Sequence, residues 1–188
     1  GSFALNQYQE RDLDCLMERT SKRPLPSGSV QPKLALFLAI SMICLGTLLN
    51  LAVSWQVAAL GLFTVFFYNY LYTTKWKRSS PFAAIPGAIP GAMPFVIGYT
   101  AASGVVFDRI NFYFFMVMFF WQMPHFWALA LRYKDDYAKG GIPVLPAARG
   151  QKVTEYYVGL YTFAYLTLAL SAPFVVPVGW AYLLVAMP

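Results

Sequence analysis

Charged residues are scarce in this sequence. Asp, Glu, Lys and Arg make up 12% of its 188 residues, whereas they form about a quarter of a typical soluble domain. Hydrophobic residues reach 59% and aromatic residues 18%. These proportions exclude an ordinary soluble domain and predict an all-α fold, a polytopic transmembrane helical bundle.

Cysteine and histidine are also rare, which excludes several kinds of site. Cys15 and Cys44 fit neither a disulfide framework nor a zinc-binding pattern, so we interpret both as packing residues. His125 is the only histidine, and one histidine cannot form a zinc site by itself. The middles of the apolar stretches have no acidic or basic residue, which argues against the ion or proton pathway of a transporter.

Long apolar runs are abundant. Each has roughly the length that a helix needs to cross a hydrocarbon core of about 30 Å. Five complete spans are predicted, at about residues 34–53, 56–74, 82–103, 110–131 and 153–172. Part of a sixth span begins near residue 174 and is cut off at Pro188.

Basic residues are distributed unequally among the loops. All but one of the 14 Lys and Arg residues lie in three segments, 1–33, 75–81 and 132–152, and the exception is Arg109. Because successive spans alternate in direction, these three segments fall on one side of the membrane. The positive-inside tendency makes that side the cytoplasm or the mitochondrial matrix.

Acidic residues gather on the same side of the membrane. Asn6, Glu10 and Asp14 recur every four residues, so on a helix their oxygens lie along one face, one turn apart. Such a ladder of oxygen ligands suits Mg²⁺, which is commonly held by one or two carboxylates together with substrate phosphates. Asp135 and Asp136 form a second acidic cluster in the third basic segment.

Two acidic clusters with a basic segment between them favour a site for a polyanion held through metal ions, with Lys and Arg contacting phosphate oxygens. A signal for membrane orientation needs only Lys and Arg, because acidic residues contribute little to it. The alternative is a solvated face beside the membrane with local ion pairs. The residue pattern leaves both interpretations open.

The predicted span 82–103 repeats Pro86-Gly87, Pro90-Gly91 and Pro94 at four-residue intervals. The repeat places small residues and missing backbone donors along one stripe of the helix. This pattern favours close helix packing, or a wall beside a cavity, over direct contact with a substrate.

The predicted span 110–131 is dense in aromatic residues and carries His125 near one end. An ionisable residue in a membrane helix is by default a functional hypothesis, and the alternative is an interfacial histidine within a Trp and Phe belt. Aromatic faces can pack an isoprenoid or stabilise a carbocation. The rings occupy every face of this helix, however, so most of them contact lipid or other helices.

Several motifs, in the same order, resemble the UbiA-type intramembrane prenyltransferases, and more narrowly the protohaem IX farnesyltransferase (haem O synthase) branch. The first is NQYQERDLDCLMERTSKRPLPSG at residues 6–28. Lys77-Arg78 and the Gly/Pro-rich span follow it. The most specific motif is PHFWALALRYKDDYAKGGIPVLP at residues 124–146. Together these motifs cover most of the chain.

The resemblance implies a larger helical bundle around a central cavity, with the two acidic motifs facing each other at its cytoplasmic mouth. Residues 1–188 are then a single membrane prenyltransferase domain that lacks helices at its N-terminal and C-terminal ends. The implied reaction transfers a farnesyl group from farnesyl diphosphate to the vinyl group of haem B, giving haem O, with Mg²⁺ as cofactor. The implied location is the bacterial inner membrane or the mitochondrial inner membrane.

Site residues are carried over position by position from the motifs. The resemblance assigns the catalytic and metal-binding positions to Asn6, Glu10, Asp14, Asp135 and Asp136. It assigns diphosphate contacts to Arg11, Lys77, Arg78, Arg132, Lys134 and Lys139. It assigns contact with haem or another acceptor to His125, Trp127 and Tyr137.

The expected partners are farnesyl diphosphate, haem B and the lipid bilayer, with haem A synthase or oxidase assembly factors as protein partners and no nucleic acid. One alternative is a related enzyme that prenylates a quinone precursor or another aromatic or tetrapyrrole acceptor. It would share the acidic motifs but lack the combination of PHFW with KDDY and GIPVLP. The non-enzymatic alternative is a membrane transporter.

Overall fold

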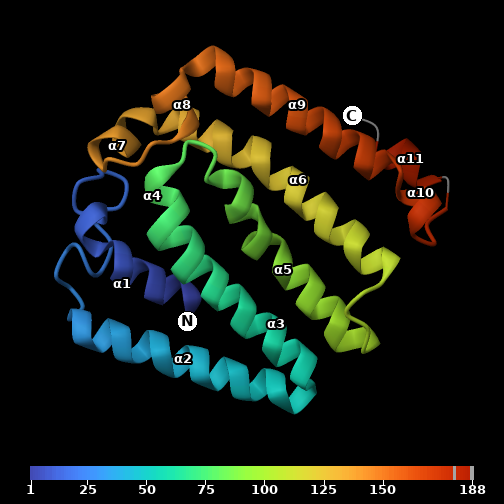
Figure 1. The fold of residues 1–188 in the computed structure, drawn as a ribbon, viewed down its shortest axis with the longest axis horizontal. Coiled ribbons are helices and arrows are strands. Elements are labelled where there is room, and N and C mark those ends of the chain that lie inside the picture. The colour runs from blue at the N-terminus through green and yellow to red at the C-terminus, as the bar shows by residue number, and fades with distance from the viewer. Residues whose placement is uncertain (180, 187–188) are drawn as a thin grey trace.

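The computed structural model describes residues 1–179 and 181–186, and the regular elements in that part of the chain are all helical (Figure 1). The prediction of an all-α fold is therefore confirmed. The elements are α1 (Ser2–Asp14), α2 (Pro32–Val53), α3 (Trp55–Phe66), the π-helix η1 (Phe67–Trp76), α4 (Lys77–Ser79), α5 (Ala84–Ser103), α6 (Arg109–Arg132), α7 (Lys134–Lys139), α8 (Leu145–Arg149), α9 (Gln151–Leu170), α10 (Ala172–Val175) and α11 (Ala181–Ala186).

Four helical stretches of the described chain are long and apolar enough to cross a membrane. They are α2, the continuous stretch Trp55–Ser79 formed by α3, η1 and α4, then α5 and α6. The predicted fifth span corresponds to α9, which is not among the four helices that meet this criterion of length and hydropathy. The reason is composition, because α9 contains Lys152, Glu155 and four tyrosines.

The sixth predicted span is interrupted in the structure. The chain leaves the helical conformation after α10 at Val175 and becomes helical again in α11 at Ala181. The remainder of this prediction, at residues 180, 187 and 188, lies outside the described residues.

Short polar turns reverse the chain between spans. Ser54 caps α3 by accepting a hydrogen bond from the backbone N–H of Val57 at 3.2 Å. Asp108 caps α6 in the same way through the N–H of Ile110. Gly104 ends α5 at φ +74°, a left-handed conformation that glycine adopts without steric cost.

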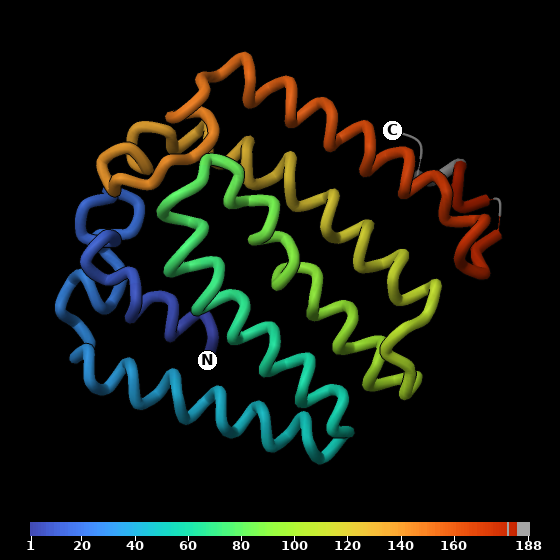
Figure 2. The backbone as a smooth tube through the Cα atoms, viewed as in Figure 1, coloured from blue at the N-terminus to red at the C-terminus, as the bar shows by residue number. Residues whose placement is uncertain are grey.

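The long helices lie side by side in the order α9, α6, α5, α3 and α2 (Figures 1 and 2). Helix α1 packs against both α2 and η1. The C-terminal end of α1, together with α4, α7 and α8, lies near the same ends of these long helices, at the left of Figure 1. Polar segments far apart in the sequence are thus collected at the same end of the spans.

Helix α5 packs closely through two of its repeated glycines, which confirms the packing interpretation of the Pro/Gly repeat. A Cβ atom on Gly91 would lie 1.8 Å from Oε1 of Gln122 in α6, and one on Gly87 would lie 2.6 Å from the ring of Tyr72 in η1. Gln122 is buried there and donates to the carbonyl oxygens of Ala88 and Met118. Only a glycine leaves room for each of these side chains.

Candidate functional site

The predicted ladder of oxygen ligands faces the protein interior. Asn6, Glu10 and Asp14 are the buried residues of α1, with exposed fractions of 7%, 3% and 1%. Buried carboxylates are costly unless a cation or hydrogen-bond donors compensate them, so their surroundings decide what the ladder can do.

Each acid of the ladder is paired with a cation from another segment. Lys77 Nζ donates to Glu10 Oε2 at 2.6 Å, and Arg23 Nη1 donates to Asp14 Oδ2 at 2.8 Å. Asn6 is held differently, because its Nδ2 donates to the hydroxyl of buried Thr73 at 3.1 Å. The ladder is therefore fixed mainly by η1 and α4 on one side and by the segment after α1 on the other.

One oxygen of the ladder is left without a protein partner. Glu10 Oε1 is buried and accepts no hydrogen bond in the described part of the structure. Such a buried acceptor costs free energy unless something satisfies it. A carboxylate oxygen with this need, one helical turn from a second carboxylate, fits the oxygen-ligand preference of Mg²⁺.

The second acidic motif docks against the segment that follows α1. Asp136 accepts hydrogen bonds from the backbone N–H groups of Arg19 at 3.1 Å and Glu18 at 2.7 Å. These donors, the Arg19 N–H first, hold the pKa of the Asp136 carboxyl below its ordinary value. Gly140 packs against the side chain of Met17 in the same contact. The two motifs are thus neighbours across a loop contact.

Asp135 differs from Asp136 in that it makes no such contacts and is exposed. Both residues line an open surface hollow of about 650 Å³. The other residues that line this surface hollow are Glu18, Arg19, Lys22, Arg132, Tyr133 and Lys139. The surface hollow therefore places cations beside an exposed carboxylate.

The described residues contain no group of three or more His, Cys, Asp or Glu side chains that could hold a metal by themselves. The ladder carboxylates and the α7 carboxylates are thus two smaller sets. Mg²⁺ is commonly bound through one or two carboxylates plus substrate phosphates, so sets of this size are compatible with it.

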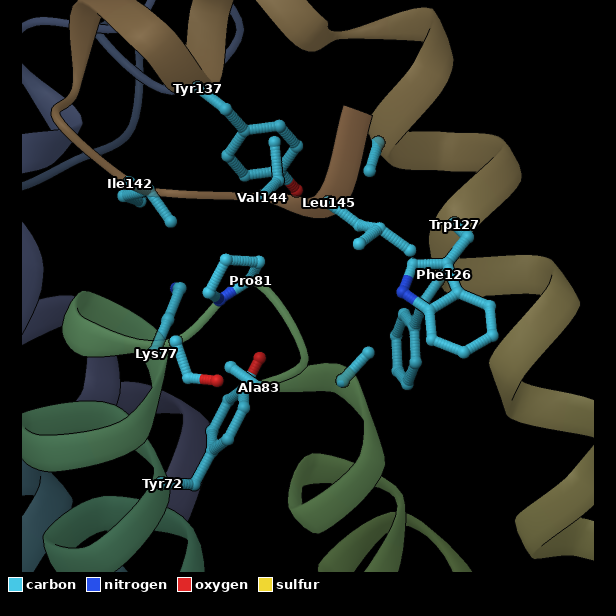
Figure 3. Close-up of a pocket in the computed structure, with 13 residues that line it drawn as sticks. Tyr72, Lys77, Pro81, Ala83, Phe126, Trp127, Tyr137, Ile142, Val144 and Leu145 are labelled. Carbon is cyan, nitrogen blue, oxygen red and sulfur yellow. The ribbon is translucent and has the colours of Figure 1, made fainter. Parts of the chain in front are cut away.

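A small cavity of about 70 Å³, here called the central cavity, lies between η1, the start of α5, α6 and the segment 137–145. Figure 3 shows Tyr72, Lys77, Tyr137 and Trp127 directed into it from different elements. Its remaining wall is mostly apolar, with Phe126, Ile142, Val144 and Leu145 among the lining residues. Lys77 links the central cavity to the ladder, because it lines the cavity and also binds Glu10.

Trp127 brings an unused hydrogen-bond donor to the central cavity. Its side chain is 1% exposed, and its Nε1–H has no acceptor in the described chain. The ring is fixed by contacts with Tyr157 and Tyr161 of α9. The indole N–H can only donate, so the cavity is suited to a ligand group that accepts a hydrogen bond.

Other predicted site residues lie outside the central cavity. His125 is exposed and stacks on Trp121, with ring centroids 5.3 Å apart.

Three predicted diphosphate contacts also lie outside the central cavity. Arg11 donates to the carbonyl oxygen of Tyr8 at 2.7 Å, and Arg78 donates to that of Gln9 at 3.4 Å. Lys134 is exposed and lines neither the central cavity nor the surface hollow.

Tyr72 and Thr73 are site residues that the motif reasoning missed. Both belong to a stretch that read only as the end of an apolar span. One feature of the sequence points to Tyr72. It is Gly87 of the Pro/Gly repeat, whose missing side chain makes the space for the Tyr72 ring. Thr73 had no such signal, since its contact with Asn6 depends on how α1 packs on η1.

Fold and site together define an intramembrane helical bundle with acids and cations at one end of its spans. The model of the UbiA prenyltransferase family matches residues 1–188, and the chain belongs to that family. It is accordingly an integral membrane protein, with four helices of suitable length and hydropathy in its described part.

Curated relatives carry a more specific name. The Protoheme IX farnesyltransferase of Bdellovibrio bacteriovorus is 49% identical over 188 residues, which are 100% of this chain and 64% of that protein. Its namesake from Paracoccus denitrificans is 41% identical over 187 residues, covering 99% of this chain and 61% of the relative. The one from Streptomyces avermitilis is 39% identical over 191 residues, covering 100% and 61%. The chain thus spans less than two thirds of the length of these relatives.

A solved structure with a similar fold is that of a UbiA homolog from Archaeoglobus fulgidus bound to DMAPP and Mg²⁺. Its TM-score is 0.71 at 16% sequence identity, and the match covers 98% of this chain and 65% of that one. At this identity, the similarity supports the UbiA-like fold.

Proposed function

We propose that the complete protein transfers a farnesyl group from farnesyl diphosphate to a vinyl group of haem B, giving haem O, in a Mg²⁺-dependent reaction. The observation that carries the proposal is the pairing of buried Glu10 with Lys77 beside the central cavity, in a chain 49% identical to a Protoheme IX farnesyltransferase. In the balanced reaction the allylic C–O bond breaks, a C–C bond forms to the vinyl group, water supplies the hydroxyl group, and diphosphate and a proton leave.

Asn6, Glu10 and Asp14 from the ladder, with Asp135 from α7, are the residues that would hold Mg²⁺. The unpartnered Glu10 Oε1 supports this assignment. When bound, Mg²⁺ supplies positive charge that stabilises the leaving diphosphate. The UbiA homolog of similar fold was solved with Mg²⁺ and a prenyl diphosphate, which agrees with a metal-dependent site.

Within the second motif we assign the metal-binding role to Asp135 and a positioning role to Asp136. Both oxygens of Asp136 are already used by backbone N–H groups of the segment after α1. Asp135 is exposed in the surface hollow beside Arg132 and Lys139, where its carboxylate is available to a metal ion. Asp136 then keeps α7 against the end of α1, so that Asp135 lies on the same side of the protein as the ladder.

Cations of this chain would stabilise the negative charge that develops on the departing diphosphate. Lys77 carries this role at the central cavity, and Arg132 and Lys139 carry it at the surface hollow. Arg11, Arg78 and Lys134 remain predicted diphosphate contacts in the complete protein. Charge stabilisation is stronger in a site that excludes water, and the mostly apolar wall of the central cavity provides such an environment.

For the acceptor, Trp127 and Tyr137 are the best-supported contacts because both line the central cavity. His125 stays a predicted haem contact at an exposed position on α6, next to the aromatic face of Trp121. We place the acidic motifs on the cytoplasmic or matrix side, in agreement with the positive-inside tendency. Haem A synthase or oxidase assembly factors are the protein partners that we propose for the complete protein.

The test uses the complete protein purified in detergent and incubated with haem B, farnesyl diphosphate and Mg²⁺. Mass spectrometry is expected to detect farnesylated haem that carries the added hydroxyl group, and chelation of Mg²⁺ is expected to abolish it. Product with a phenolic quinone precursor but none with haem B would contradict the haem assignment. It would favour the related quinone-type prenyltransferase instead.

A further inference from the structure

Three hydrogen bonds between two side chains join α1 to the helix formed by η1 and α4. They pair Asn69 with Ser2 at 2.6 Å, Asn6 with Thr73 at 3.1 Å and Lys77 with Glu10 at 2.6 Å, and each pair is 67 residues apart. The constant separation means that the two helices run in parallel with matched four-residue steps. Ser2, Asn6 and Glu10 of α1 are therefore hydrogen-bonded to a second polar ladder, which is formed by Asn69, Thr73 and Lys77.

Asn69 and Thr73 of the second ladder lie on a π-helix of ten residues, whereas most π-helical segments in proteins are single turns, and Lys77 is the first residue of α4. The Thr73 hydroxyl donates to the carbonyl oxygen of Tyr68, five residues earlier, at 2.8 Å. Thr64 and Ser79, in the flanking α3 and α4, and Thr74, within η1, instead donate four residues back. Thr73 thus follows the wider π-helical turn.

The hydrogen bonds of the Thr73 hydroxyl determine the orientation of the Asn6 side-chain amide. A threonine hydroxyl has one hydrogen, and here Tyr68 receives it, so the oxygen can only accept from Asn6. Thr73 is 0% exposed, so bulk water does not reach its hydroxyl group. The amide of Asn6 must therefore turn its Nδ2 toward Thr73. Its Oδ1 makes no hydrogen bond in the described chain.

We propose that Thr73 is a positioning residue, which holds the Asn6 carboxamide so that Oδ1 is available as a ligand for a divalent cation. The π-helical geometry of η1 directs the Thr73 hydroxyl hydrogen to the carbonyl oxygen of Tyr68, which leaves the Thr73 oxygen to accept from Asn6. The inference rests on the proposed function, since it assigns a role toward the Mg²⁺ of that function. Residues that orient metal ligands in this way commonly change metal affinity by about 10-fold to 100-fold when replaced.

The test measures binding of Mn²⁺ alone to the complete protein by electron paramagnetic resonance, independently of turnover. Thr73→Val is expected to weaken Mn²⁺ binding on the order of tenfold, and Thr73→Ser is expected to restore it. The matched control is Thr154→Val, because Thr154 is also 0% exposed but its hydroxyl donates only to the Gly150 carbonyl oxygen in its own segment. This control is expected to bind Mn²⁺ like the wild type.

A second experiment, in the Asn6→Asp variant, separates the effect of Thr73→Val on the orientation of the Asn6 amide from its effect on packing. In Asn6→Asp both side-chain oxygens accept, so no amide orientation has to be selected, and adding Thr73→Val is expected to have little further effect. The inference would be overturned if Thr73→Val bound Mn²⁺ with wild-type affinity. It would also be overturned if Thr73→Val lowered the Mn²⁺ affinity as much in the Asn6→Asp variant as in the wild type. Neither result would contradict the metal site itself. Absence of Mn²⁺ binding to the wild type would contradict both the inference and the metal dependence of the proposed function.

Discussion

Glu10 has two oxygens in different surroundings. Oε2 is bound by Lys77, whereas Oε1 is buried and unpartnered in the described chain. The residue is therefore held in the interior by an ion pair, yet keeps one oxygen for a ligand. This division explains how an acid can be both part of the folded core and part of a binding site.

Lys77→Met leaves the Glu10 charge buried without its cation. Breaking a buried ion pair from one side typically costs about 3 kcal/mol or more, and we expect a loss of about 3 kcal/mol in the free energy of unfolding. Unfolding of the complete protein in detergent measures it. The control is Lys75→Met, since exposed Lys75 contacts only the ring of Tyr70 and should cost under about 1 kcal/mol. Equal effects of the two changes would contradict the pairing.

The contact made by Asp136 should depend on pH. Its folded-state pKa is lowered by the N–H groups of Arg19 and Glu18, so the contact is fully stabilising above the ordinary Asp value of about 3.9. It is lost as the pH falls through the lower, folded-state value. Hydrogen exchange at the Glu18 and Arg19 amides should show protection near neutral pH and its loss in acid. Asp136→Asn should exchange faster near neutral pH, and protection that persists through acid would refute the contact.

At the scale of elements, the packing of α5 on α6 depends on Gly91. The absence of a side chain there admits the carboxamide of Gln122, which is bonded to two backbone carbonyl oxygens. The buried polar group is thereby satisfied in the middle of a span, where unsatisfied backbone and side-chain groups are costly. The Pro/Gly repeat is therefore a packing feature that supports the wall behind the central cavity.

Gly91→Ala should force Gln122 out of its hydrogen bonds and destabilise the protein by about 1–3 kcal/mol. Thermal unfolding in detergent measures the effect. Gly98→Ala in the same helix is the control, because a Cβ atom there meets nothing within 4 Å and alanine favours the helix. If Gln122→Ala does not relieve part of the Gly91→Ala penalty, the contact between them is not the cause.

At the scale of the whole molecule, the charged ends of the spans define its orientation. Cys15 is exposed in the charged segment after α1, and Cys44 is exposed on α2, of which only Ala39 is buried, so the interpretation of both cysteines as packing residues is wrong. A membrane-impermeant maleimide should therefore label Cys15 in inside-out bacterial vesicles but not in right-side-out ones. Cys44 should stay unlabelled in both, as a lipid-facing residue. Peptide mapping identifies the labelled site, and labelling of Cys15 from the outside would reverse the proposed orientation.

Much of this architecture is predictable because its causes are local in sequence. Apolar length predicts the spans, and four-residue spacing predicts that Asn6, Glu10 and Asp14 share a buried face. The resemblance predicted a central cavity and assigned Lys77, Trp127 and Tyr137 to the site, but their meeting with Tyr72 was not predictable from local sequence, because the four residues come from separate elements. The π-helix was also not predictable, since the stretch 67–76 has no periodicity that distinguishes it from an α-helix. Helix α9 has the length of a span, but its polar residues keep it outside the four helices that meet the hydropathy criterion.

The most direct test concerns the claim that the α1 ladder and Asp135 of α7 hold one diphosphate through Mg²⁺. It measures the affinity of the complete protein for a non-reactive thio analogue of farnesyl diphosphate, with and without Mg²⁺, in the wild type, Glu10→Gln and Asp135→Asn. We predict that Mg²⁺ tightens binding to the wild type and that each variant loses most of this gain, on the order of tenfold. A wild-type response to Mg²⁺ in either variant would contradict the account.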